Sequence, residues 1–238
     1  MGRAFEFRKA RKIKRWSNMA KTFTRISRDI IIAVKESGPD PSSNSRLRAI
    51  IQNAKSANMP KENIKRAIKK ASEKSTENFI ELLLEGYASN GIAILIEAAT
   101  NNNNRTVANI RSYFNKCDGN LATQGSVDFL FNHFCFFQIE VNGTDIEQLE
   151  LDLIDFGVIE LIKIKNEISI TAKFEDFGSV QKELERRKFK ISSIEFEREA
   201  VITKDLSEEE RYEVEKLLNM IDEDEDVQNV YHNMKTID

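Results

Sequence analysis

Few residues of this 238-residue chain are of the types that catalyse reactions or bind metals. His133 and His232 are the only histidines, and neither lies in a spaced metal-ligand motif. Cys117 and Cys135 form no CxxC pair, so we expect two buried thiols in a reducing compartment, the cytoplasm. No GxGxxG, Walker-type loop or nucleophile elbow is present. The sequence therefore predicts a non-enzymatic protein with no cofactor and no small-molecule substrate.

Three aspartates near the end of the chain resemble the start of a calcium-binding loop. Asp222, Asp224 and Asp226 alternate as in an EF-hand. However, Val227 stands at the sixth position, where the loop requires glycine, and Asn233 at the twelfth, where it requires glutamate. The sequence therefore predicts no calcium site and no other metal site.

Charge is divided very unevenly along the chain. The first 75 residues contain 20 Lys and Arg against 6 Asp and Glu, a net charge of +14. The remaining residues contain 16 against 33, a net charge of −17, and residues 205–226 alone contain 11 acids. Such a division predicts an electrostatic role for the basic part, of which phosphate binding is the most direct. The acidic part is expected to orient the basic part on its partner, to cover it in the free state, or simply to be solvated.

The basic residues lie on an N-terminal arm and on predicted helices. Lys61, Lys65 and Lys69 recur every four residues on one helix, with Arg66 and Lys70 beside them. Like charges at that spacing destabilise a helix by a few tenths of a kcal/mol per pair, so this face favours a phosphate partner over a solvated surface. The predicted nucleic-acid-binding residues are Arg8, Lys9, Arg11, Lys12, Lys14, Arg15, Lys21, Arg25, Arg28, Arg46, Arg48, Lys55, Lys61, Lys65, Arg66, Lys69 and Lys70.

These residues require a small three-helix unit to position them. Apolar residues at three- and four-residue steps predict a first helix from about Met19 to Lys35. The SGPDPSSN segment (37–44) ends it, and a second helix follows to about Ala57. A third helix begins after the NMP segment (58–60) and carries its core residues Ile64, Ala67, Ile68 and Ala71 on one side.

Beyond residue 75 the pattern changes to alternating strands and helices, which predicts an α+β protein. Predicted strands cover 91–99, 126–132, 135–141, 167–173, 192–199 and 227–231. Predicted helices cover 104–116, 145–156, 175–188 and a final segment from a Ser207 cap to about Asp222. Two successive strand–helix units between 135 and 199 predict a ferredoxin-like module.

Several segments resemble the YebC/PmpR family, which includes the mitochondrial translational activator of cytochrome c oxidase subunit I. They are MAKTFTRISRDI, NSRLRAIIQNAKSANMPKENIKRAIKKA, EGYASNGIAILIE, NRTVANIRSYFNK, GNLATQGSVDFLF and DEDEDVQNVYHNM. The resemblance covers essentially the whole chain. It departs from the family at the start, where GRAFEFRKARKIKRWS replaces GHSKWANIKHRKA, and at TNNNNRT, where Asn101 and Asn103 replace an acid and a base.

The resemblance implies three domains and a role in gene expression. The expected domains are a basic helical domain (1–77), an α/β middle domain completed by the C-terminus (78–133 plus 205–238) and an inserted ferredoxin-like domain (134–204). Family members are described as DNA-binding transcriptional regulators or as ribosome-associated translation factors that assist proline-rich stretches. We therefore expect a cytoplasmic nucleic-acid-binding regulator, with DNA as the first candidate partner and ribosomal RNA or tRNA, on the ribosome, as the alternative. A pure protein-interaction scaffold is a third hypothesis, and no membrane partner is expected.

Overall fold

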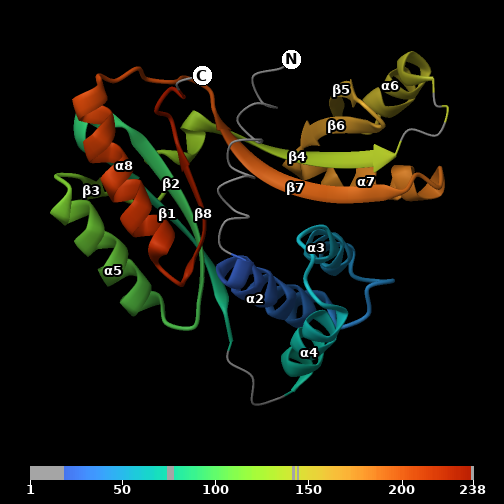
Figure 1. The fold of residues 1–238 in the computed structure, drawn as a ribbon, viewed down its shortest axis with the longest axis horizontal. Coiled ribbons are helices and arrows are strands. Elements are labelled where there is room, and N and C mark those ends of the chain that lie inside the picture. Colours follow the sequence, from blue (N-terminus) through green and yellow to red (C-terminus); the bar gives the residue numbers. More distant parts are fainter. Residues whose placement is uncertain (1–18, 74–77, 141–142, 144, 237–238) are drawn as a thin grey trace. The chain divides into compact units, whose positions relative to one another are not determined.

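A computed structural model describes residues 19–73, 78–140, 143 and 145–236 of the chain. It confirms an α+β fold with an N-terminal helical region and two antiparallel sheets (Figure 1). The described residues form two compact units. Among the described residues, one unit draws on 19–32, 73, 78–132 and 199–236, and the other on 33–72, 133–140, 143 and 145–198. The domain boundaries after residues 77, 133 and 204 stay predictions.

Three helices open the described chain, as the sequence predicts. They are α2 (Met19–Ser37), α3 (Ser45–Ser56) and α4 (Lys61–Ser72). The Asn44 side chain caps α3 by accepting a hydrogen bond from the Leu47 backbone N–H at 2.9 Å, and it donates one to the Ala33 carbonyl at 2.7 Å. One polar side chain thus starts α3 and ties it to the end of α2.

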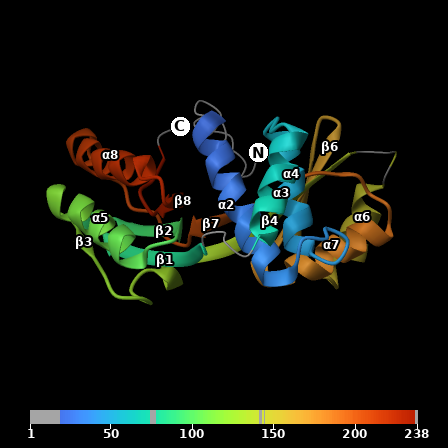
Figure 2. The same ribbon diagram turned by 90° about the horizontal axis from the view of Figure 1, so that it is seen from below.

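The first unit is built on a sheet of order β3-β1-β2-β8. Its central strand β2 buries Ile94 and Ile96 on one face and Ala93 and Leu95 on the other. The Ile94 face packs against the apolar sides of two helices, α5 and α8, which Figures 1 and 2 show beside this sheet. The elements of this unit are β1 (Ile80–Tyr87), β2 (Ala93–Thr100), α5 (Asn103–Lys116), β3 (Asn120–Leu121), α8 (Glu208–Glu223) and β8 (Val227–His232).

The second unit contains the predicted ferredoxin-like module. Its chain order is strand, helix, strand, strand, helix, strand, and its sheet order is β5-β6-β4-β7. Alternate residues of β4 and β6 form the core with the buried sides of α6 and α7. The elements are β4 (Phe131–Glu140), α6 (Ile146–Ile154), β5 (Val158–Ile164), β6 (Glu167–Lys173), α7 (Phe177–Arg186) and β7 (Ile191–Ala200).

Helix α3 packs along β7, an edge strand of this sheet. The Gln52 amide and the Ser56 hydroxyl donate hydrogen bonds to the Ser192 carbonyl at 3.0 and 2.7 Å. The Ile194 N–H donates one to the Asn53 side-chain oxygen at 3.0 Å. Polar side chains of a helix therefore satisfy backbone groups that an edge strand would otherwise expose.

The sequence prediction missed three strands, which are β1, the two-residue β3 and β5. Strand β5 is an edge strand that carries exposed Glu160 and Lys163, and such charges conceal the alternation that marks a strand. The prediction of a strand at 126–132 was wrong, because a short 3-10 helix occupies Asp128–Leu130 and β4 begins at Phe131.

The cause of that error is Glu85, a buried carboxylate on β1. It accepts backbone N–H hydrogen bonds from Gly125 at 2.7 Å, Val127 at 2.5 Å and Asp128 at 2.9 Å. Burial would raise the pKa of Glu85, but these hydrogen bonds outweigh it and lower the pKa. The loop donors are thus committed to Glu85 and are not available to a strand ladder.

Candidate nucleic-acid interface

Among the predicted site residues that the structure describes, those of helix α4 form the strongest concentration of exposed positive charge. It buries Ile64, Ala67 and Ala71, which fixes which side faces outward. The opposite side carries five exposed cations, here called the α4 basic face: Lys61, Lys65, Arg66, Lys69 and Lys70.

The α4 basic face has little acidic compensation on its own helix. Glu62 is the only acid in α4, and its carboxylate lies 3.3 Å from the Lys65 ammonium. Both side chains are largely exposed, so this ion pair contributes roughly 0–1 kcal/mol and does not prevent Lys65 from contacting another anion. The predicted positions of these five residues on one exposed helix side are confirmed, whereas their binding role stays a prediction.

The predicted site residues of α2 are placed differently, because they contact an acidic segment near the C-terminus (residues 222–226). Lys21 donates to the carbonyl and the carboxylate of Asp222, and Arg25 donates to the same two groups at 3.0 and 3.1 Å. Arg28 donates to the Glu225 carbonyl and lies 3.4 Å from the Asp226 carboxylate. In this structure these three cations bind the chain's own acids.

The predicted residues of α3 are also dispersed. Arg46 pairs with Glu36 at 2.8 Å, and Arg48 pairs with Glu185 of α7 at 3.0 Å. Lys55 is exposed in the last turn of α3. The residues of the basic arm, Arg8, Lys9, Arg11, Lys12, Lys14 and Arg15, lie outside the described residues.

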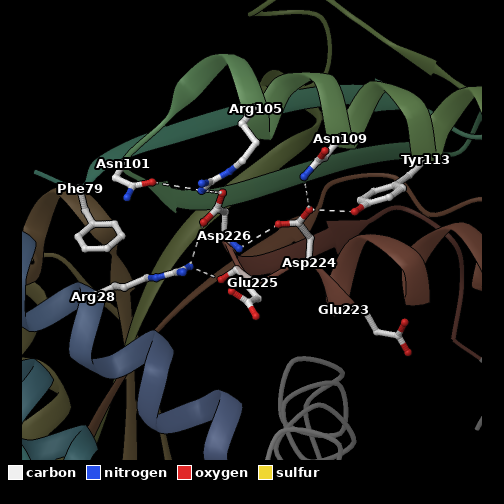
Figure 3. A pocket seen from close by; sticks show the side chains of 10 residues that line it. All are labelled: Arg28, Phe79, Asn101, Arg105, Asn109, Tyr113, Glu223, Asp224, Glu225 and Asp226. Atoms are coloured by element: carbon white, nitrogen blue, oxygen red, sulfur yellow. Dashed lines mark hydrogen bonds and ion pairs between the residues drawn. The ribbon is translucent and has the colours of Figure 1, made fainter. Parts of the chain in front are cut away.

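A polar pocket of about 560 Å³ lies beside the acidic segment in the first unit (Figure 3). At its centre Asp226 is nearly buried and accepts hydrogen bonds from Arg105 and from the hydroxyls of Thr100 and Thr106 at 2.7–3.1 Å. Burial would raise the pKa of Asp226, but these hydrogen bonds and the charge of Arg105 outweigh it and lower the pKa. Asp226 is therefore an ionised anchor between Arg105 and Arg28.

The other wall of the pocket holds the neighbouring carboxylate, Asp224. It accepts hydrogen bonds from the Tyr113 hydroxyl at 3.0 Å and the Asn109 amide at 3.3 Å, and Figure 3 shows both side chains reaching it from α5. Burial and this hydrogen bond raise the pKa of Tyr113. Four carboxylates line the pocket against two guanidinium groups, so the pocket repels anions.

His133 and the two cysteines occupy structural positions. His133 stacks on Phe174 with ring centroids 3.8 Å apart, and both cysteines are buried free thiols, as the sequence predicts. Burial, followed by the charge of Asp176, raises the pKa of Cys135 to about 12, so its thiol is not a nucleophile. Among the described residues no three His, Cys, Asp or Glu side chains gather into a metal-binding group. No helix among the described residues is both long and apolar enough to cross a membrane.

Sequence reasoning missed Arg105. It left open whether the acidic part covers the basic part, and it did not identify α2 and the acidic segment as the partners. The alternating acids Asp222, Asp224 and Asp226 contact side chains of α2 and α5 in the structure. A signal was present: Lys21, Arg25 and Arg28 lie at helical spacing, and a run of five acids is the obvious complement to them.

Two family models together match nearly the whole chain. The model described as the TACO1/YebC protein N-terminal domain matches residues 3–74, and the one described as the TACO1/YebC second and third domain matches residues 79–234.

Curated relatives agree over the full length. Probable transcriptional regulatory proteins of Flavobacterium psychrophilum and Flavobacterium johnsoniae are each 63% identical over 235 residues, which is 99% of this chain and 100% and 99% of the relatives. One of Porphyromonas gingivalis is 54% identical over 236 residues, 99% of this chain and 98% of that protein. The crystal structure of a conserved hypothetical protein from Aquifex aeolicus has a TM-score of 0.73 and 35% identity, covering 92% of this chain and 90% of that one.

Proposed function

The chain belongs to the TACO1/YebC family, and from that premise we propose that it is a nucleic-acid-binding regulator of gene expression that holds phosphates on the α4 basic face. The α4 basic face is the observation that carries the proposal. Five cations project from a helix whose opposite side is buried, and a single acid accompanies them. Each phosphate neutralised by such a cation releases condensed counterions, which favours binding at low salt.

The names of the relatives support DNA as the partner and transcription as the process, because several are called probable transcriptional regulatory proteins. The composition of α4 supports phosphate contacts more than base contacts. Its exposed side is cationic, and its one amide side chain, Asn63, accepts a hydrogen bond from Arg66. Phosphate contacts position a protein on nucleic acid without reading sequence.

That same observation favours a competing function, a ribosome-associated translation factor that binds ribosomal RNA or tRNA. A helix face without free Asn or Gln amides for base edges suits structured RNA as well as duplex DNA. In its more specific form, this second proposal holds that the protein assists the synthesis of proline-rich stretches.

The test replaces Lys65 and Lys69 together by Gln in the full chain. The slope of log K against log salt changes by about 0.9 per phosphate contact on duplex DNA and about 0.7 on single strands. We therefore expect the slope to become shallower by about 1.4–1.8, with a similar loss of affinity on unrelated sequences. Binding would be measured by fluorescence anisotropy with a labelled DNA duplex and a labelled structured RNA over a salt series.

The matched control is Lys182→Gln with Lys216→Gln, which removes two exposed helical lysines from α7 and α8. It should leave the slope unchanged. A folded Lys65→Gln/Lys69→Gln protein with wild-type affinity and slope would remove α4 from the interface, and the arm from Arg8 to Arg15 would become the next candidate. Tighter binding to RNA than to DNA at equal salt would favour the translation factor.

A further inference from the structure

In the contact between α2 and the acidic segment, a positively charged side of α2 faces a negatively charged segment. Lys21, Arg25 and Arg28 follow one side of α2 at steps of four and three residues. Their side chains are only 21, 15 and 13% exposed, since each is turned toward the acidic segment (residues 222–226).

The acidic segment offers these cations the same kind of acceptors that a nucleic-acid backbone offers. Asp222 lies in the last turn of α8, where main-chain carbonyls lack partners within the helix and carry the negative end of its dipole. Lys21 and Arg25 bind both the carbonyl and the carboxylate of Asp222. Two cations are therefore held by an anionic group at a helix end.

The two acidic contacts differ in how easily they can open. The Asp226 side chain is 5% exposed and is also bound by Arg105, so Arg28 is anchored. The Asp222 side chain is 43% exposed, so its ion pairs are weakened by solvent and by salt. Release of Lys21 and Arg25 is thus possible without disturbing the Asp226 anchor.

The acids of this segment that form no ion pair with a described residue also repel phosphates from this side of α2. Glu223 and Glu225 are exposed, and within the described part of the chain no ion pair is recorded for either side chain. With five acids in the segment against Lys21, Arg25, Arg28 and Arg105, the local charge is negative while the contact is closed.

We propose that Asp222 is an intramolecular competitor of nucleic acid: it occupies Lys21 and Arg25 in the free protein, and these two cations become phosphate ligands when the contact opens. This inference rests on the proposed nucleic-acid-binding function. It makes α2 a second, masked phosphate-binding face of the same protein.

The central variant is Asp222→Asn, which removes the carboxylate charge and keeps the size of the side chain. The carbonyl contacts of Asp222 remain in this variant, so one or both cations are released, and the slope of log K against log salt should become steeper by about 0.7–1.8, with tighter binding at low salt. The control is Glu223→Gln, which removes the same charge from an exposed neighbour without an ion pair and should leave the slope at its wild-type value.

The deciding measurement is a double-mutant cycle. Lys21→Gln with Arg25→Gln should leave the slope of the wild-type protein unchanged but cancel the added slope in the Asp222→Asn protein. Equal losses in both backgrounds would show that the two cations contact nucleic acid already, and an unchanged slope for a folded Asp222→Asn protein would show that the contact is only structural. Either result overturns the inference.

Two further measurements distinguish failure of this inference from misfolding of a variant and from failure of the proposed function. The Lys21→Gln/Arg25→Gln protein can be tested even where Asp222→Asn does not fold, and a shallower slope for it alone contradicts the proposal. If the wild-type protein does not bind nucleic acid, that result contradicts the proposed function instead. Circular dichroism and Tm accompany every variant.

Discussion

At the scale of single residues, two buried carboxylates, Glu85 and Asp226, organise the first unit by different means. Glu85 collects three backbone N–H groups of one loop, and Asp226 collects side chains from α2, α5 and β2. In both cases an ionised oxygen satisfies donors that come from separate parts of the chain. Such a carboxylate cannot be exchanged for an amide without presenting a donor to a donor.

We expect Glu85→Gln to destabilise the first unit by about 1–3 kcal/mol, because the amide N–H₂ of glutamine would face backbone N–H groups. Urea unfolding followed by circular dichroism measures the change. Glu215→Gln, at an exposed position of α8, is the control and should have little effect. Equal stability of the two variants would mean that the Glu85 hydrogen bonds contribute nothing net.

At the scale of elements, the connection from α6 to β5 depends on one glycine. Gly157 has a φ of +91°, and a Cβ at this position would lie 2.3 Å from the Asp176 carboxyl carbon. Gly178, in α7, has open space around its Cα on the side of a Cβ. The two glycines therefore respond in opposite directions to the same substitution.

Gly157→Ala should destabilise the second unit by about 1–3 kcal/mol through strain and a clash. Gly178→Ala should stabilise it by about 0.4–1 kcal/mol, since alanine restricts the unfolded chain and fits the helix. The midpoints of thermal unfolding report both changes. A shift of the same sign for the two variants would contradict the geometry described for Gly157.

The elements also separate what the sequence could predict from what it could not. Helices with a buried stripe, such as α4, are local patterns, and the exposed side of α4 was predicted correctly. Of its four expected core residues, three are buried and Ile68 is half-buried. The partner of Lys21 and Arg25 lies about two hundred residues away in sequence, and no local pattern contains it. The strand expected at 126–132 failed for the same reason, because Glu85 lies forty residues before the loop that it controls.

At the scale of the whole molecule, carboxylates in both units hold their protons less tightly than they would in an unfolded chain. The pKa is lowered for Glu85, Asp222 and Asp226 in the first unit. In the second unit, hydrogen bonds from Arg186 and Arg187 lower the pKa of Glu183 to about 2. A group with a lower pKa in the folded state binds fewer protons there, so protonation favours unfolding.

The free energy of unfolding should therefore be nearly constant above about pH 5 and decrease as the pH falls below about 4.5, continuing toward pH 2. Urea titrations at several pH values measure it. Asp226→Asn and Glu183→Gln should each lower stability at pH 7 and flatten the decrease in acid. Stability that does not change between pH 7 and pH 3 would show that these carboxylates are not linked to folding.

The hydrogen bonds from α3 to β7 also bear on how this chain avoids self-association. Gln52, Asn53 and Ser56 take the place of a neighbouring strand. They form hydrogen bonds with the Ser192 carbonyl and the Ile194 N–H, which could otherwise pair with a strand of another molecule. A shortened protein without α3 would leave this border of the sheet open to strand addition from a second molecule. Helix α3, which belongs to the basic N-terminal region, therefore protects this edge strand from aggregation.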